Sequence, residues 1–201
     1  MNRKIGTVSS IINTCAVAGF AVCMLFNFLF GDYLTSMFIA FSFVPMICAF
    51  AAQGKAESKA FGNAAMVFAG MYGTVILLVY FTQVSTVRLE SLNDQAKSLI
   101  DYTAFGLFFN YDQLGYCLMA LSTFFAGMTI NARTKSDRAL KRLLMIHGVF
   151  AISCFIIPML GIFNRDMQGA EWIGTAILLF WCVYFIPVGV LSYNYFRNTG
   201  A

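Results

Sequence analysis

Charge and histidine are both scarce in this sequence. Charged residues make up 11% of its 201 residues and hydrophobic residues 60%, whereas a soluble domain carries about 25% charged and 45–50% apolar residues. This composition is not that of a soluble globular protein. The single histidine, His147, cannot form a haem-ligand pair or a metal cluster. No basic stretch is interleaved with exposed aromatic residues, so nucleic acid is not an expected partner.

Signatures of known enzyme chemistry are also missing. The chain has neither a P-loop nor a G-x-G-x-x-G motif, and no lysine lies within an apolar run to hold retinal. No C-x-x-C pair or zinc spacing occurs, so we predict no cofactor and no metal. The six cysteines all fall within apolar runs and are expected to act as small packing residues; they are Cys15, Cys23, Cys48, Cys117, Cys154 and Cys182.

Long apolar runs are what the sequence has in abundance. Each can cross about 30 Å of hydrocarbon as a helix, and none shows the two-residue alternation of a membrane β-strand. The connections are too short for a soluble domain. We therefore predict an all-α polytopic membrane protein, a six-transmembrane-helix bundle formed by one domain, 1–201. The predicted spans are about 8–30, 34–52, 60–82, 105–130, 143–163 and 172–195.

The charges between these runs predict an orientation. When the connections are assigned alternately to two sides, ten basic and two acidic residues share one side, and three basic and seven acidic residues share the other. Basic loops stay cytoplasmic, so both termini are expected inside a plasma membrane, where the basic side meets anionic lipid headgroups. The ten basic residues are Arg3, Lys4, Lys55, Lys59, Arg133, Lys135, Arg138, Lys141, Arg142 and Arg197.

The longest connection is predicted to be external. Within 84–102, Leu89, Leu92, Ala96 and Leu99 recur at helical spacing with charged residues between them. This pattern indicates an amphipathic helix at the membrane surface. Two interpretations stay open, a linker that lies on the interface and a lid over an outward-facing cavity.

Asp112 is the most suggestive polar residue in the predicted spans. An ionisable group inside a membrane is costly and indicates function. If its helix begins near Ala104, Asp112 lies in the outer third of the membrane and needs a partner. If the span begins at Leu114, Asp112 only caps it at the interface. Asp112 and Tyr116 share one helical face, so the first alternative would point both into the bundle.

Other polar groups are expected near the same outer half of the membrane. Asn27, Gln83, Asn110 and Glu171 would join Asp112 and Tyr116 in an external cup with no basic residue in the spans. Such a cup suits a cation, an amine or a polar headgroup better than an anion. The alternative is an interfacial belt of aromatic residues, to which we assign Tyr33, Trp172, Tyr193 and Tyr195.

The stretch from the fourth to the fifth span holds two further candidates. Asp137 is expected to cap the fifth helix at its basic start. His147 lies about one turn inside the cytoplasmic end of that span. We weigh two roles for it, a structural hydrogen bond and a proton relay or substrate contact.

Two segments carry a resemblance to known proteins. Residues 108–116, FFNYDQLGY, and 144–148, LMIHG, resemble small six-span integral membrane proteins of clostridia-type bacteria. The resemblance implies a bacterial plasma membrane and no particular activity. Size and span count are also similar to substrate-binding subunits of energy-coupling-factor vitamin transporters. Those often carry an alanine at every fourth residue of the first span, whereas here Ala16 is followed at that spacing by Phe20.

Three functional hypotheses follow. The leading one is a non-enzymatic protein that binds or transports a small molecule through a site open to the outer half of the membrane, with Asp112 as its electrostatic anchor. The second is an accessory or structural subunit that packs against a larger membrane partner or a second copy. The third is an intramembrane enzyme, for which we assign no catalytic residue. No internal repeat supports an inverted-repeat transporter.

Overall fold

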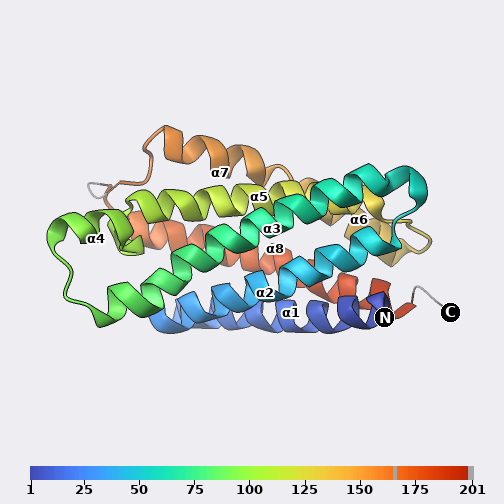
Figure 1. Cartoon of the computed structure of the whole chain (residues 1–201), viewed down its shortest axis with the longest axis horizontal. Coiled ribbons are helices and arrows are strands. Elements are labelled where there is room, and N and C mark those ends of the chain that lie inside the picture. The colour runs from blue at the N-terminus through green and yellow to red at the C-terminus, as the bar shows by residue number, and fades with distance from the viewer. Residues whose placement is uncertain (165–166, 199–201) are drawn as a thin grey trace.

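In the computed structural model, the described part of the chain folds into one elongated bundle of helices (Figure 1). The structure describes residues 1–164 and 167–198, except for the side chains of residues 170 and 171, and no strand occurs in this part. The helices are α1 (Asn2–Leu25), α2 (Leu29–Gln53), α3 (Lys59–Thr82), α4 (Asp94–Ile100), α5 (Leu107–Thr129), α6 (Lys135–His147), α7 (Phe150–Met159) and α8 (Ala170–Asn198), with short turns η1 (Ala56–Ser58), η2 (Gln83–Val87) and η3 (Tyr102–Ala104).

Five helical stretches are long and apolar enough to cross a membrane. A lipid core contains no water, so a spanning backbone must satisfy its hydrogen bonds within the helix. Five such stretches among the described residues are typical of a membrane protein and agree with the composition. The stretches are Asn2–Leu25, Leu29–Gln53, Ala56–Val87, Lys135–Met159 and Trp172–Asn198.

Helix α5 is the remaining long helix, and its polar residues set it apart from those five. It has 23 residues, of which thirteen are buried, including Asp112. It packs against α3, α6 and α7. The buried polar residues, such as Asp112, Ser122 and Thr123, therefore face protein, the arrangement expected for polar residues inside a membrane. A sixth span at this helix stays a prediction.

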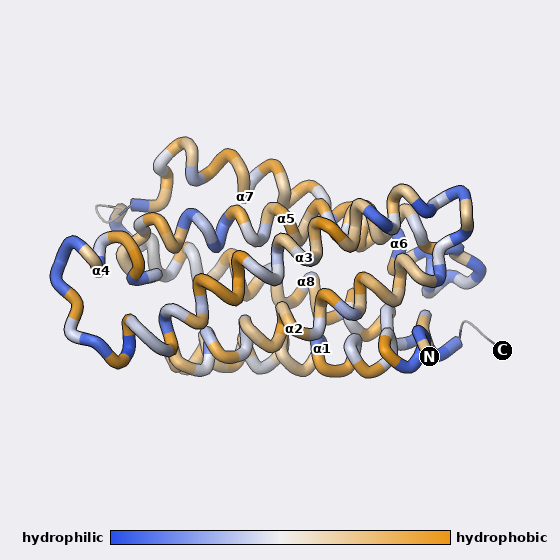
Figure 2. The backbone as a smooth tube through the Cα atoms, viewed as in Figure 1, coloured by the Kyte–Doolittle hydropathy of each residue, from blue (hydrophilic) through white to orange (hydrophobic). Residues whose placement is uncertain are grey.

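The chain termini and two of the turns lie at the same end of the bundle. Arg3 donates hydrogen bonds from Nε to the Phe196 carbonyl (3.1 Å) and from Nη2 to the Arg197 carbonyl (2.6 Å). A cation stabilises the carbonyl end of a helix, so Arg3 holds α1 to the end of α8. Turns 54–58 and 130–134 lie near both termini, and α4 lies at the opposite end. Hydrophilic segments mark both ends in Figure 2.

Several predicted boundaries were wrong. The first helix covers Asn2–Leu25 rather than 8–30, because helical hydrogen bonding extends through polar residues that hydropathy excludes. The predicted span 143–163 lies largely within the apolar stretch Lys135–Met159, in which a break at Gly148 separates α6 from α7. An added Cβ at Gly148 would lie 2.9 Å from the Phe124 Cβ, so glycine allows close contact at this break.

The cap of α6 and the segment predicted to be external also differ from the prediction. The cap of α6 is Thr134, which accepts from the Asp137 N–H while the Asp137 side chain accepts from the Thr134 N–H. Asp137 is therefore the reciprocal member of a capping box and not the cap itself. In the segment predicted to be external, helix α4 covers only Asp94–Ile100, and α3 continues as a π-helical turn over Gln83–Val87.

Small residues bring neighbouring helices close together. Ala65, Ala69 and Gly73 are buried on α3, and the Ser122 hydroxyl of α5 donates to the Ala65 carbonyl at 2.9 Å. This spacing is typical of close helix packing in membranes. On α8, an added Cβ at Gly189 would lie 2.1 Å from a Thr14 side-chain atom of α1. The two helices can approach this closely only because Gly189 has no side chain.

Candidate functional site

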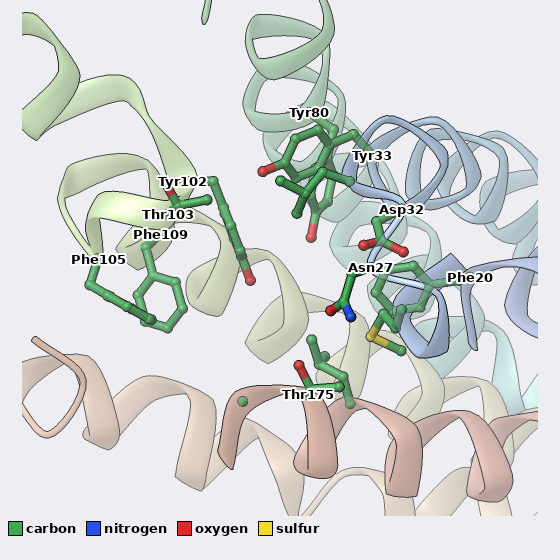
Figure 3. Close-up of a pocket in the computed structure, with 14 residues that line it drawn as sticks. Phe20, Asn27, Asp32, Tyr33, Tyr80, Tyr102, Thr103, Phe105, Phe109 and Thr175 are labelled. Atoms are coloured by element: carbon green, nitrogen blue, oxygen red, sulfur yellow. The ribbon is translucent and has the colours of Figure 1, made fainter. Parts of the chain in front are cut away.

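A cavity opens at the end of the bundle opposite the termini, and we call it the distal cavity (Figure 3). Its volume is about 300 Å³. Six elements, α1, α2, α3, η3, α5 and α8, contribute to its wall together with the turns beside them. The described lining contains no lysine and no arginine, and consists of Phe20, Met24, Asn27, Leu29, Asp32, Tyr33, Tyr80, Tyr102, Thr103, Phe105, Phe109, Gly174, Thr175 and Leu178.

Asp32 is the carboxylate in this wall. It lies in the first turn of α2, where the positive end of the helix dipole favours an anion. Its side chain is 8% exposed, and its Oδ1 has no hydrogen-bond partner among the described residues. A buried polar atom that lacks a partner carries a desolvation cost. An incoming donor could remove that cost.

The hairpin between α1 and α2 aims Asp32 at the cavity. Asn27 takes a left-handed conformation with φ of 52°, which asparagine adopts more readily than most residues. Gly31 allows the chain to fold back, since an added Cβ there would lie 2.5 Å from the Cys23 Sγ. Figure 3 shows the Asn27 amide and the Asp32 carboxylate beside one another at the open centre.

Three tyrosines from different elements, Tyr33, Tyr80 and Tyr102, form a cluster that extends along the wall from Asp32, and we call them the tyrosine cluster. The ring centroids lie 5.6 Å apart for Tyr33 and Tyr80, 5.9 Å for Tyr80 and Tyr102, and 6.1 Å for Tyr33 and Tyr102. Aromatic faces carry negative potential and attract cations. The cavity therefore offers a carboxylate on one side and electron-rich rings on another.

Asp112 lies behind this cluster. It is fully buried in the second turn of α5, so it does not cap the start of that helix. Its depth in a membrane stays a prediction. Its Oδ2 accepts a long hydrogen bond of 3.4 Å from the Tyr102 hydroxyl, and its Oδ1 has no hydrogen-bond partner among the described residues. Asp112 does not line the distal cavity and contacts it through Tyr102.

Gln83 holds the chain around residues 100–102 against the bundle. Its Nε2 donates to the Ile100 carbonyl at 2.8 Å, and its Oε1 accepts from the Tyr102 N–H at 3.0 Å. The side chain is 2% exposed. Both ends of one amide thus fix the backbone that carries Tyr102 and Thr103 to the cavity.

Replacing Gln83 by leucine should loosen this segment. The substitution leaves the Ile100 carbonyl and the Tyr102 N–H without their partner, and an unsatisfied buried group costs about 1–3 kcal/mol. We expect faster amide hydrogen exchange across 94–105 with little change in α1 or α8. Gln95→Leu is the matched control, because Gln95 is exposed on α4. Equal exchange in the two variants would show that Gln83 does not hold the segment.

The other predicted site residues are scattered. Asn27 lines the distal cavity, whereas Asn110 is exposed on the outside of α5. Tyr116 is buried and lines a different cavity beneath α7. Glu171 was predicted to join them, and its side chain lies outside the described residues.

Sequence reasoning missed Asp32 and two members of the tyrosine cluster. We counted Asp32 only as an external charge, did not single out Tyr102, and assigned Tyr33 to the interfacial belt. Tyr195, also assigned to that belt, is 4% exposed and packs with its ring centroid 5.7 Å from that of Phe50. The available signal was the short connection, residues 31–33, between the first two predicted spans, which is too short to project Asp32 and Tyr33 into water.

His147 is engaged through both ring nitrogens. The Trp181 Nε1–H donates to Nε2 at 3.0 Å, so Nδ1 must carry the proton of the neutral ring. Nδ1 lies 2.8 Å from the Thr123 hydroxyl, which donates in turn to the Ala120 carbonyl at 2.9 Å. His147 therefore ties α6 to α5 and α8.

No protein-family model, no curated protein and no solved structure matches the chain. We therefore infer function from the distal cavity and its lining residues alone.

Proposed function

We propose that this protein binds a small organic cation, an amine or a quaternary ammonium group, in the distal cavity, as a non-enzymatic binding or transport protein. The observation that carries the proposal is the partly unpartnered carboxylate of Asp32 in a wall whose described residues include no basic side chain. An isolated buried carboxylate is costly. A bound cation would compensate it where the protein itself supplies no positive charge.

The rest of the wall favours an organic cation over a metal ion. Hard metal ions require about six oxygen ligands, and no group of three His, Cys, Asp or Glu residues gathers among the described residues. The wall instead combines the tyrosine cluster with apolar side chains such as Phe20 and Leu178. Aromatic surfaces around a carboxylate are typical of sites for quaternary ammonium groups. Asn27 and Thr175 offer polar atoms to orient the ligand.

The test compares choline with its neutral isostere, 3,3-dimethylbutanol, on the purified full chain. We expect choline and butylamine to raise the melting temperature in a saturable way, because a ligand that binds only the folded state stabilises it. The isostere and butyrate should have little effect. Equal stabilisation by choline and the isostere would show that the cavity does not recognise positive charge.

We also propose that the distal cavity faces outward in a bacterial plasma membrane that the chain crosses six times, with α6 and α7 together as one span. The ten basic residues on one side of the predicted topology support a cytoplasmic location for both termini. A green fluorescent protein fused after Ala201 should then fluoresce, and alkaline phosphatase at the same position should be inactive. The opposite pair of results would invert the protein and turn the cavity toward the cytoplasm.

A further inference from the structure

A second cavity lies beneath α7, and we call it the lateral cavity. Its volume is about 260 Å³. Helices α5, α7 and α8 supply most of its wall, and Phe163 closes it near the distal end, with its ring centroid 5.7 Å from that of Phe109. The two cavities share four lining residues, Tyr102, Phe109, Gly174 and Leu178.

The lateral cavity exists because α7 stands at the side of the bundle. Helix α7 packs along α5, whereas the main contacts of α8 are with α1 and α6, and Figure 1 shows α7 at the edge. On its outer surface Ile152 is 68% exposed and Met159 66% exposed. In a membrane this surface meets lipid, so the space between α7 and α8 lies next to the hydrocarbon.

The wall of the lateral cavity consists mostly of rings and aliphatic groups, with the Gln113 amide and the Tyr116 hydroxyl among its few polar groups. The polar atoms of His147 and Trp181 satisfy each other, and the Ser153 hydroxyl donates to the Phe150 carbonyl at 3.0 Å. No charged residue is among its described lining residues. Such a mostly apolar and uncharged chamber suits an alkyl chain better than a charged headgroup.

Gly174 marks the junction between the two cavities. It lines both of them, and an added Cβ there would meet no atom within 4 Å. The space next to Gly174 is therefore empty rather than filled by packed side chains. The polar chamber beside Asp32 and the apolar chamber beneath α7 adjoin here.

We propose that the ligand is a single-chain cationic amphiphile, with its amine beside Asp32 and its alkyl chain running past Gly174 into the lateral cavity. This inference depends on the proposed amine binding in the distal cavity. It adds that affinity grows with chain length, since each methylene moved from water into an apolar site raises affinity by about fourfold.

The experiment titrates the purified full chain with butylamine, hexylamine and octylamine, and with octanoate for comparison. We expect affinity to rise by at least tenfold from butylamine to octylamine, with octanoate far weaker than octylamine. Gly174→Leu should place its side chain at the junction and remove the gain in affinity from butylamine to octylamine. Gly70→Leu is the control, because an added Cβ at Gly70 also meets no atom within 4 Å and Gly70 is exposed on α3.

The outcomes separate this inference from the proposed function. If all three amines bind with one affinity, the amphiphile is overturned and the small-cation site survives. If octanoate binds as tightly as octylamine, or no amine binds, the proposed function itself fails. A chain-length effect that persists in Gly174→Leu, or that disappears equally in Gly70→Leu, overturns the route past Gly174.

Discussion

Replacing Asp32 by asparagine is expected to weaken choline binding by about 10- to 100-fold. A hydrogen bond or contact to a charged group contributes about 1.5–3 kcal/mol, which corresponds to that range of affinity. Asparagine has nearly the same shape as aspartate and a similar helix propensity. The fold should therefore persist while the negative charge is lost. Isothermal titration of the purified variant measures the effect directly.

Two further variants make this result specific to the cavity. Asp94→Asn removes a negative charge from the exposed first turn of α4 and should leave choline affinity unchanged. Asp112→Asn should change it by only a few-fold, because Asp112 does not line the distal cavity. A larger loss in Asp112→Asn than in Asp32→Asn would return the anchor to the residue that the sequence predicts.

The helices could be predicted because hydropathy averaged over about twenty residues is a strong signal. The same averaging hides the break at Gly148. Glycine is common within membrane helices. The residues on both sides of the break, 143–147 and 149–159, are mostly apolar. The gap that forms the lateral cavity therefore leaves no mark in the sequence pattern.

The candidate site was predicted only in part, and the reason is geometric. Asp112 stands out because an acidic residue interrupts an apolar run, and it is buried. Asp32 lies between two runs, where a charge is ordinary. Whether such a residue faces water or the bundle depends on the turn, here on the left-handed Asn27 and the close approach at Gly31. Those features become visible only in three dimensions.

Replacing Trp181 by alanine is expected to produce the largest loss of stability, about 3–5 kcal/mol, the usual cost of deleting a buried aromatic side chain. Trp181 is 5% exposed, its ring centroid lies 4.9 Å from that of Phe185, and it supplies the donor to His147. Its loss would leave the His147 Nε2 without a partner and enlarge the lateral cavity. Unfolding in mixed micelles with a denaturing detergent measures the change.

Two other substitutions divide that cost between volume and hydrogen bonding. Trp181→Phe keeps an aromatic ring but removes the donor, and should cost about 1–2 kcal/mol, since hydrogen bonds inside membrane proteins average only ~0.6 kcal/mol and some ring volume is also lost. Trp172→Ala should change stability by less than about 0.5 kcal/mol, because Trp172 is 67% exposed. If Trp181→Phe proved as damaging as Trp181→Ala, the hydrogen bond to His147 would outweigh packing. The network through Thr123 would then be what holds α5, α6 and α8 together around the lateral cavity.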